Sequence, residues 1–258
     1  SNVVQLTPAQ ASKHTGNLLL SDEQQVIQTE GGTWSELFPA DSLLNLHPWL
    51  AMVTWYLVIL LLGVMVYPLM RLVFKGLPDK GYPLARIAGI VLLAYFTWLA
   101  ASVGGQFSKL TIVLCLVGIV LVNGYLAYRQ RDQLRQELKG KWKYFITVEV
   151  IGLLLFGLML YIRWGNPDLW HPWRGGEKPM DLSYFTAVLK STVFPPYDPW
   201  YSGGYINYYY FGFVIAAVPT KLLGIVPSVA YNLIIPTFFA FTGLGVFSIG
   251  WNLLRHLL

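Results

Sequence analysis

The apolar residues of the chain gather into long runs that short polar or basic connectors separate. The runs cover residues 48–70, 84–103, 110–128, 144–162, 208–223 and 229–254. Most approach the ~20 residues that an α-helix needs to cross ~30 Å of hydrocarbon, although 208–223 is short for a crossing. The alternating pattern of a membrane β-barrel is absent. The pattern therefore predicts an all-α polytopic membrane protein with about six transmembrane helices.

Composition agrees with a membrane protein. The chain of 258 residues is 55% hydrophobic and 12% charged, whereas soluble domains average roughly 25% charged residues. The net charge of +5 resides in the connectors. We therefore expect membrane lipids as partners and no nucleic acid. The one cysteine, Cys115, lies in an apolar run and excludes an intrachain disulfide.

The connectors predict the orientation. Residues 71–86 and 129–143 are rich in Lys and Arg, which favours the cytoplasmic side, whereas 103–109 is nearly neutral. We therefore expect a multi-pass protein of the cytoplasmic membrane with its N-terminal arm and its connector 163–207 outside. Lys221 then marks a short cytoplasmic turn before the last span.

The same pattern divides the chain into three parts. Residues 1–46 form a polar extramembrane arm with room for a short surface helix. Residues 47–143 form a three-span bundle with basic cytoplasmic connectors. Residues 144–258 hold a span, the long external loop 163–207 and two further spans.

The loop 163–207 is the longest non-apolar segment between spans. Loops above ~15 residues are uncommon unless functional or disordered, and this one is rich in Trp and Tyr, which disordered segments lack. Its residues Leu182, Phe185, Val188 and Leu189 recur at helical spacing. They predict an amphipathic helix on the outer membrane surface, with Asp181 at or near its N-terminus.

Each polar residue of this loop has a structural and a functional interpretation. Asp181 fits a helix cap, Glu177 and Lys178 fit a solvated pair, and Asp198 fits a rigid turn between prolines. The tyrosines at 208–210 fit an interfacial aromatic belt. So many specific residues in one connector nevertheless favour a site.

Within the spans, Glu149 is the residue of most interest. An ionisable group inside a membrane helix is a functional hypothesis, and the alternative is a shallow carboxylate that snorkels or pairs with a Lys. The four histidines are scattered without metal-ligand spacing. The sequence contains no Walker loop, Rossmann glycine pattern or nucleophile elbow.

Three segments of the sequence resemble a known family. They are GGEKPMDLSYFTAVLKSTVFPPYDPWYSGGYINYYYFG, LPDKGYPLARIAGIVLLAYFTWLAAS and VEVIGLLLFGLMLYIRWGNPDL. Together they resemble DUF2298, a membrane family of Chloroflexi-type bacteria and archaea that is known by its Tyr-Tyr-Tyr motif. The resemblance covers roughly residues 67–254.

That family is grouped by similarity with the GT-C membrane glycosyltransferases. The resemblance implies an enzyme, or its N-terminal part, that takes a sugar from a polyprenyl-phosphate donor at the external membrane face. It makes the fourth span the first helix of the glycosyltransferase core. It also implies acidic residues in the long external loop.

The resemblance and the chemistry of sugar transfer suggest roles for the loop residues. Asp181, with Glu177, is the candidate catalytic carboxylate. A divalent metal is a candidate cofactor, with Asp181 and Asp198 as its ligands. The candidate substrate-binding residues are Arg174, Lys178, Asp198, Trp200, Tyr208, Tyr209 and Tyr210.

An alternative remains open, because the chain is shorter than the family's usual members and GT-C enzymes have more spans. The alternative is a non-catalytic subunit of a larger membrane assembly. It rests on small-residue stretches at 103–106 and 243–250 that allow close helix approach. A transporter is disfavoured, because inverted repeats are absent and intramembrane charges are few.

Overall fold

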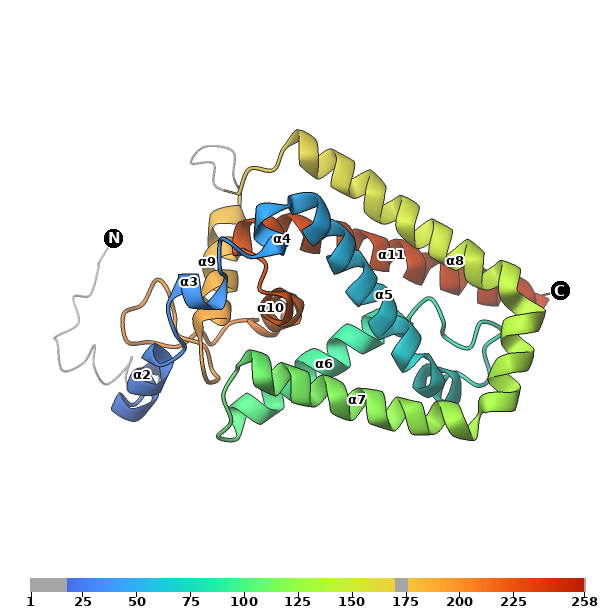
Figure 1. The fold of residues 1–258 in the computed structure, drawn as a ribbon, viewed down its shortest axis with the longest axis horizontal. Helices are drawn as coiled ribbons and strands as arrows, with labels where there is room; N and C mark the ends of the chain where they lie inside the picture. The colour runs from blue at the N-terminus through green and yellow to red at the C-terminus, as the bar shows by residue number, and fades with distance from the viewer. Residues whose placement is uncertain (1–17, 170–175, 258) are drawn as a thin grey trace, which may run out of the picture.

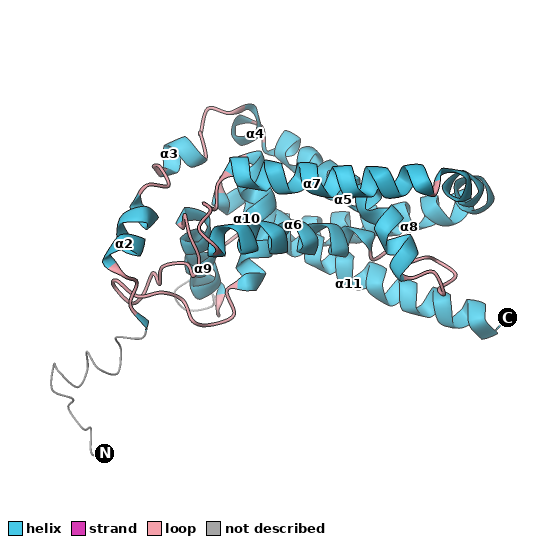
Figure 2. Ribbon diagram, turned by 90° about the horizontal axis from the view of Figure 1, so that it is seen from below, coloured by secondary structure: helices cyan, strands magenta, loops and turns pink. Residues whose placement is uncertain are grey.

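The computed structural model describes residues 18–169 and 176–257, and every regular element in those ranges is a helix (Figures 1 and 2). Two isolated β-bridges, Leu19 to Gly204 and Tyr197 to Tyr205, link the arm to the long loop and close the loop on itself. The helices are α2 (Asp22–Thr29), α3 (Trp34–Leu37), α4 (Leu43–Leu46), α5 (Pro48–Val73), α6 (Ala85–Ser102), α7 (Lys109–Arg129), α8 (Arg131–Gly165), α9 (Lys178–Lys190), α10 (Phe211–Leu223) and α11 (Pro227–Leu257).

Five of these helices, α5, α6, α7, α8 and α11, are long and apolar enough to cross a membrane. The prediction of an all-α polytopic membrane protein is confirmed. The helix expected over 208–223 forms as α10, which has 13 residues. At 1.5 Å per residue it is about 20 Å long, which is shorter than the ~30 Å of hydrocarbon.

The ends of α10 explain its length. Its first residue follows the turn of tyrosines, and Gly224 ends it in the left-handed conformation with φ of 67°. That conformation suits glycine and stops a helix. Pro227 then opens α11 only three residues later. Figure 1 shows α10 nearly end-on while α8 and α11 run along the long axis, so α10 lies across the bundle.

Lys221 lies at the same end of the bundle as the connector between α6 and α7, and not at the opposite end as expected. Its Nζ donates to the main-chain oxygens of Phe107 and, at 3.4 Å, of Ser191. Phe107 belongs to the connector between α6 and α7, which was expected on the other side of the membrane. Since carbonyl oxygens and the Phe107 ring solvate the ammonium group, its charge gives no information about a cytoplasmic connector.

The turn between α10 and α11 lies beside the N-terminal arm. Asn45 donates to the Gly224 oxygen at 2.9 Å and accepts from the Val226 N–H at 2.9 Å. We call this end of the bundle, with residues 18–47, 103–108, 166–169 and 176–210, the arm end. It lies on the left in Figure 1.

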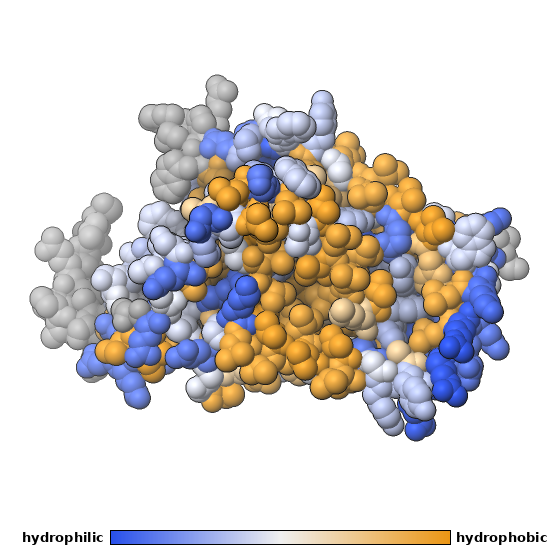
Figure 3. Space-filling view, viewed as in Figure 1, coloured by the Kyte–Doolittle hydropathy of each residue, from blue (hydrophilic) through white to orange (hydrophobic). Residues whose placement is uncertain are grey.

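The other end of α11 lies beside the connector between α5 and α6. Ser248 donates to Asp79 at 2.5 Å, and the Asp79 N–H donates to Asn252 at 3.2 Å. We call this end, with residues 74–84, 130–143 and 248–255, the basic end. Since α11 runs from the arm end to the basic end, five of the described helices, α5, α6, α7, α8 and α11, run between the two ends. A wide apolar band covers the middle of the molecule in Figure 3, with hydrophilic residues toward both ends.

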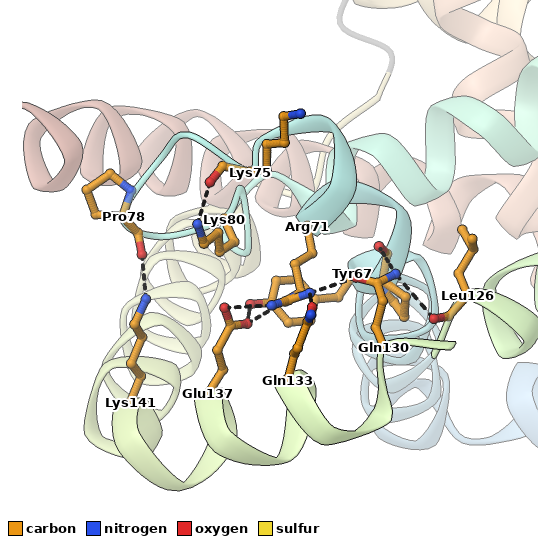
Figure 4. Close-up of polar contacts among 11 residues, drawn as sticks. Tyr67, Arg71, Lys75, Pro78, Lys80, Leu126, Gln130, Gln133, Glu137 and Lys141 are labelled. Carbon is orange, nitrogen blue, oxygen red and sulfur yellow. Dashed lines mark hydrogen bonds and ion pairs between the residues drawn. The ribbon is translucent and has the colours of Figure 1, made fainter. Parts of the chain in front are cut away.

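The basic connector expected at 129–143 is largely helical. It forms the first part of α8, which bends at Lys141, where φ is −120° and ψ is 19°. Figure 4 shows how this part is held against the end of α5. Arg71 pairs with Glu137 at 2.7 Å and donates to Gln130 and Gln133 at 2.8 and 2.9 Å. These contacts stabilise a helix that hydropathy alone does not indicate.

Candidate functional site

The helix expected in the long loop forms as α9 at the arm end. Its residues Phe185, Val188 and Leu189 are each at most 1% exposed, and the helix packs against α10. Protein therefore covers its most apolar face. Glu177 occupies the N-cap position without a side-chain capping bond, and Asp181 lies in the first turn. Asp181 is therefore not the cap, and its carboxylate remains near the positive end of the helix dipole.

Asp181 lines a pocket of about 280 Å³ where α9, α10 and α11 meet. Among the described residues it is the only charged one in the wall of this pocket, which we call the Asp181 pocket. Aromatic and aliphatic side chains make up most of the remaining wall. They are Phe185, Tyr209, Gly212, Phe213, Ala216, Tyr231, Ile234, Ile235 and Phe238. The pocket therefore combines one carboxylate with a surface suited to an apolar ligand.

The surroundings of Asp181 favour its protonated form. Partial burial raises the pKa of the Asp181 carboxyl, and the nearby charge of Glu177 raises it further. A hydrogen bond with Tyr231 lowers this pKa and offsets part of the shift. A carboxylate with a raised pKa binds protons more strongly than an ordinary Asp, which suits a general base.

Two cations meet beside the N-terminus of α9. Lys178 and Arg163 both donate to the main-chain oxygen of Asp168, each at 3.5 Å. Arg163 is buried at the end of α8 and also donates from Nε to Asn232 at 2.9 Å. Arg163 is not among the residues that the sequence pattern indicates as candidates. The sequence feature that points to it is its position at the end of an apolar run, where arginines that anchor a helix at the membrane interface are also common.

Arg163 also lines a larger pocket of about 810 Å³ between the arm-end parts of α5, α8 and α11. Its walls include Trp49, Trp164 and Leu160. Asn232 and Leu233 line this pocket, whereas Tyr231 and Ile234 line the Asp181 pocket. Two apolar hollows thus flank α11 at the arm end.

The candidate Arg174 lies outside the described residues.

Asp198 has a structural role in the loop. Its Oδ1 accepts from the N–H groups of Trp200 at 2.8 Å and Tyr201 at 3.2 Å. These bonds close the turn that the flanking prolines suggest. Trp200, also a candidate for substrate binding, is 62% exposed and points away from the core.

The three consecutive tyrosines have different surroundings. Tyr208 and Tyr209 are exposed, and their ring centroids are 3.8 Å apart. Of the three, Tyr209 contributes to the Asp181 pocket. Tyr210 turns inward, where its hydroxyl accepts from Trp98 at 3.1 Å and its ring stacks on Phe194. The motif thus supplies one pocket residue and one packing residue.

The described residues do not suit a protein-built metal site at Asp181 and Asp198. No group of three or more His, Cys, Asp or Glu side chains occurs within 18–169 and 176–257. One oxygen of Asp198 is already committed to its turn.

Comparison with protein families gives a match to the region that contains the candidate site. The family model described as uncharacterized membrane protein (DUF2298) matches residues 92–258. The matched region runs from within α6 through α11 and includes the Asp181 pocket and Arg163. No curated protein and no solved structure is significantly similar to the chain.

Proposed function

The chain belongs to the DUF2298 family of uncharacterized membrane proteins, and we propose that it acts as a glycosyltransferase-like membrane enzyme or as the front part of one. In this proposal it transfers a sugar from a polyprenyl-phosphate donor at the arm end. The observation that carries the proposal is the position of Asp181, a carboxylate with a raised pKa in an otherwise apolar pocket of the loop helix.

The two parts of such a donor match two features of the arm end. A phosphate suits the cations Lys178 and Arg163, which meet beside the N-terminus of α9. A prenyl chain suits the apolar hollows on either side of α11. Exposed rings of Trp200, Tyr208 and Tyr209 suit stacking against a sugar.

The proposed reaction is a displacement at the anomeric carbon. Asp181 accepts the proton of the acceptor hydroxyl as its oxygen forms a bond to that carbon. The bond from the anomeric carbon to the phosphate oxygen breaks, and the lipid phosphate leaves with the electron pair. Lys178 and Arg163 stabilise the charge that develops on this leaving group. Glu177 acts on the reaction by raising the pKa of Asp181.

The proposal also assigns the parts of the chain and their orientation. Residues 144–258 carry the site, residues 47–143 form a supporting bundle, and residues 1–46 are an extramembrane arm. We place the arm end outside the cell, because the basic end carries most of the Lys and Arg residues of the connectors.

The test is donor turnover by Asp181→Asn in membranes that contain the protein, with a radiolabelled polyprenyl-phosphate sugar as substrate. We expect a loss of about 10²-fold or more, which is typical of removing a general base. Glu23→Gln is the matched control, because Glu23 is an exposed carboxylate of α2 at the same end. Unchanged turnover in well-folded Asp181→Asn rules out this site assignment.

The alternative is a non-catalytic subunit, and α11 supplies its best surface. Gly250 has open space around it, and Val246, Ile249 and Leu253 are exposed. Gly243 is unsuitable for this role, because a Cβ there lies 2.3 Å from Leu155 of the same chain. A stoichiometric complex that is lost with Gly250→Leu and kept with Asp181→Asn, without donor turnover, supports the alternative.

A further inference from the structure

A third pocket lies at the basic end, far from Asp181 along the bundle. It has a volume of about 680 Å³ and lies between the bend of α8 and the last turns of α11. We call it the basic pocket. Its wall combines three cations with three aromatic rings, namely Lys141, Lys143, Arg255, Trp142, Tyr144 and Trp251. The bend at Lys141 opens the hollow, because Gly140 and Lys141 both line it.

Within the described residues, none of these three cations forms an ion pair with a carboxylate. Lys141 donates to the main-chain oxygen of Pro78 at 2.7 Å (Figure 4). The charged group of Lys143 lies 5.7 Å from the ring centre of Trp142, and that of Arg255 lies 4.9 Å from the ring centre of Trp251. All three positive charges thus lie beside neutral partners.

The nearby carboxylates are committed elsewhere. Glu137 pairs with Arg71, as Figure 4 shows. Lys141 attracts Glu137 electrostatically, but the two side chains form no ion pair. Asp79 is buried and accepts from Ser248 and from the Gly81 N–H. The basic pocket therefore keeps an excess of positive charge that suits an anion.

The surface next to the pocket suits acyl chains. Thr147 lines the pocket, and Val150 and Leu154 continue the same face of α8 at helical spacing. Both apolar side chains are exposed. Trp142 and Trp251 lie where this apolar surface meets the basic residues, the depth that Trp prefers at a membrane interface.

We propose that the basic pocket binds the phosphate headgroup of an anionic glycerophospholipid, with the acyl chains along the exposed face of α8. Basic pockets between membrane helices are suited to such headgroups. The site is independent of sugar transfer, because it shares no residue with the Asp181 pocket.

The test uses the full chain, stripped of lipid in an uncharged detergent. Fluorescent phosphatidylglycerol and phosphatidylcholine are titrated against it, and inorganic phosphate is added as a competitor. The test variant combines Lys141→Gln, Lys143→Gln and Arg255→Gln. The matched control combines Arg131→Gln, Arg135→Gln and Lys139→Gln, which removes the same charge from exposed positions of α8 outside the pocket.

We expect saturable binding of phosphatidylglycerol that is at least about tenfold tighter than that of phosphatidylcholine. The test variant should lose about tenfold or more of this affinity, while the control keeps most of it. Equal losses in the two triple variants overturn the proposal, since they indicate general charge attraction. Equal binding of both lipids, or full displacement by millimolar phosphate, also overturns it.

Discussion

Arg86 on α6 forms an ion pair with Glu149 on α8 inside the helix bundle. The hydroxyl of Tyr82 donates to the same carboxylate at 2.7 Å, and the Arg86 guanidinium lies 5.7 Å from the ring centre of Tyr56. The Arg86 side chain is 6% exposed and that of Glu149 is 30% exposed. Glu149 therefore has a structural role that joins two spans, with an arginine in place of the lysine that the sequence suggested.

Removal of one partner should destabilise the bundle strongly. Glu149→Gln or Arg86→Gln leaves a charge without its counterion, and breaking a buried pair costs about 3–5 kcal/mol. Unfolding in detergent micelles, followed by circular dichroism, measures the loss. The double variant Arg86→Met with Glu149→Leu should recover much of it. Single variants as stable as Arg131→Gln, whose charge is exposed, contradict the role of the pair.

Donor turnover should depend on pH through Asp181. Because burial and Glu177 raise the pKa of Asp181, the acid limb of the pH profile should lie above the ordinary range of an aspartate. A base works in its ionised form, so turnover rises as the pH passes this value. Glu177→Gln removes a negative charge and should move the limb to lower pH. An unmoved limb in Glu177→Gln, with Glu23→Gln as control, argues against coupling of the two carboxylates.

The contact of α5 with α6 depends on Gly63. A Cβ at this position lies 2.5 Å from the Arg86 Cγ and 3.1 Å from its Cα and N, which are backbone atoms that cannot turn aside. Gly63→Ala should therefore cost about 1–3 kcal/mol through overpacking. Gly118→Ala on α7 is the control, because open space surrounds Gly118. It should be neutral or stabilise the helix by up to about 1 kcal/mol. Thermal unfolding of both variants checks the difference, and a stable Gly63→Ala contradicts it.

The number of crossings can be measured with single cysteines. In a Cys115→Ala background, Ser228→Cys should react with an impermeant maleimide from the same side as Glu23→Cys. Asp132→Cys should react from the opposite side. All three positions are exposed. This result follows from α10, which lies across the arm end and brings the start of α11 back to the arm. If Ser228→Cys instead reacts from the same side as Asp132→Cys, the chain makes a sixth crossing.

Much of the fold follows from the sequence. The predicted runs 48–70, 84–103 and 110–128 match α5 (Pro48–Val73), α6 (Ala85–Ser102) and α7 (Lys109–Arg129) closely. The reason is local, because a lipid-exposed segment must satisfy its own backbone hydrogen bonds and be apolar along its whole length. The helix at Asp181 was also predictable from the spacing of its apolar residues, since α9 spans Lys178–Lys190.

The sequence by itself thus determined the class of the protein, its long helices and the position of Asp181 in the loop helix. Tertiary structure alone decided that α10 lies across the bundle, that Lys221 contacts Phe107 and that Arg163 meets Lys178 at one carbonyl. The physical reason is distance along the chain. Hydropathy and helical spacing depend only on residues that are near one another in the sequence. The partner of a buried charge comes from another helix, so it is determined only when the helices pack.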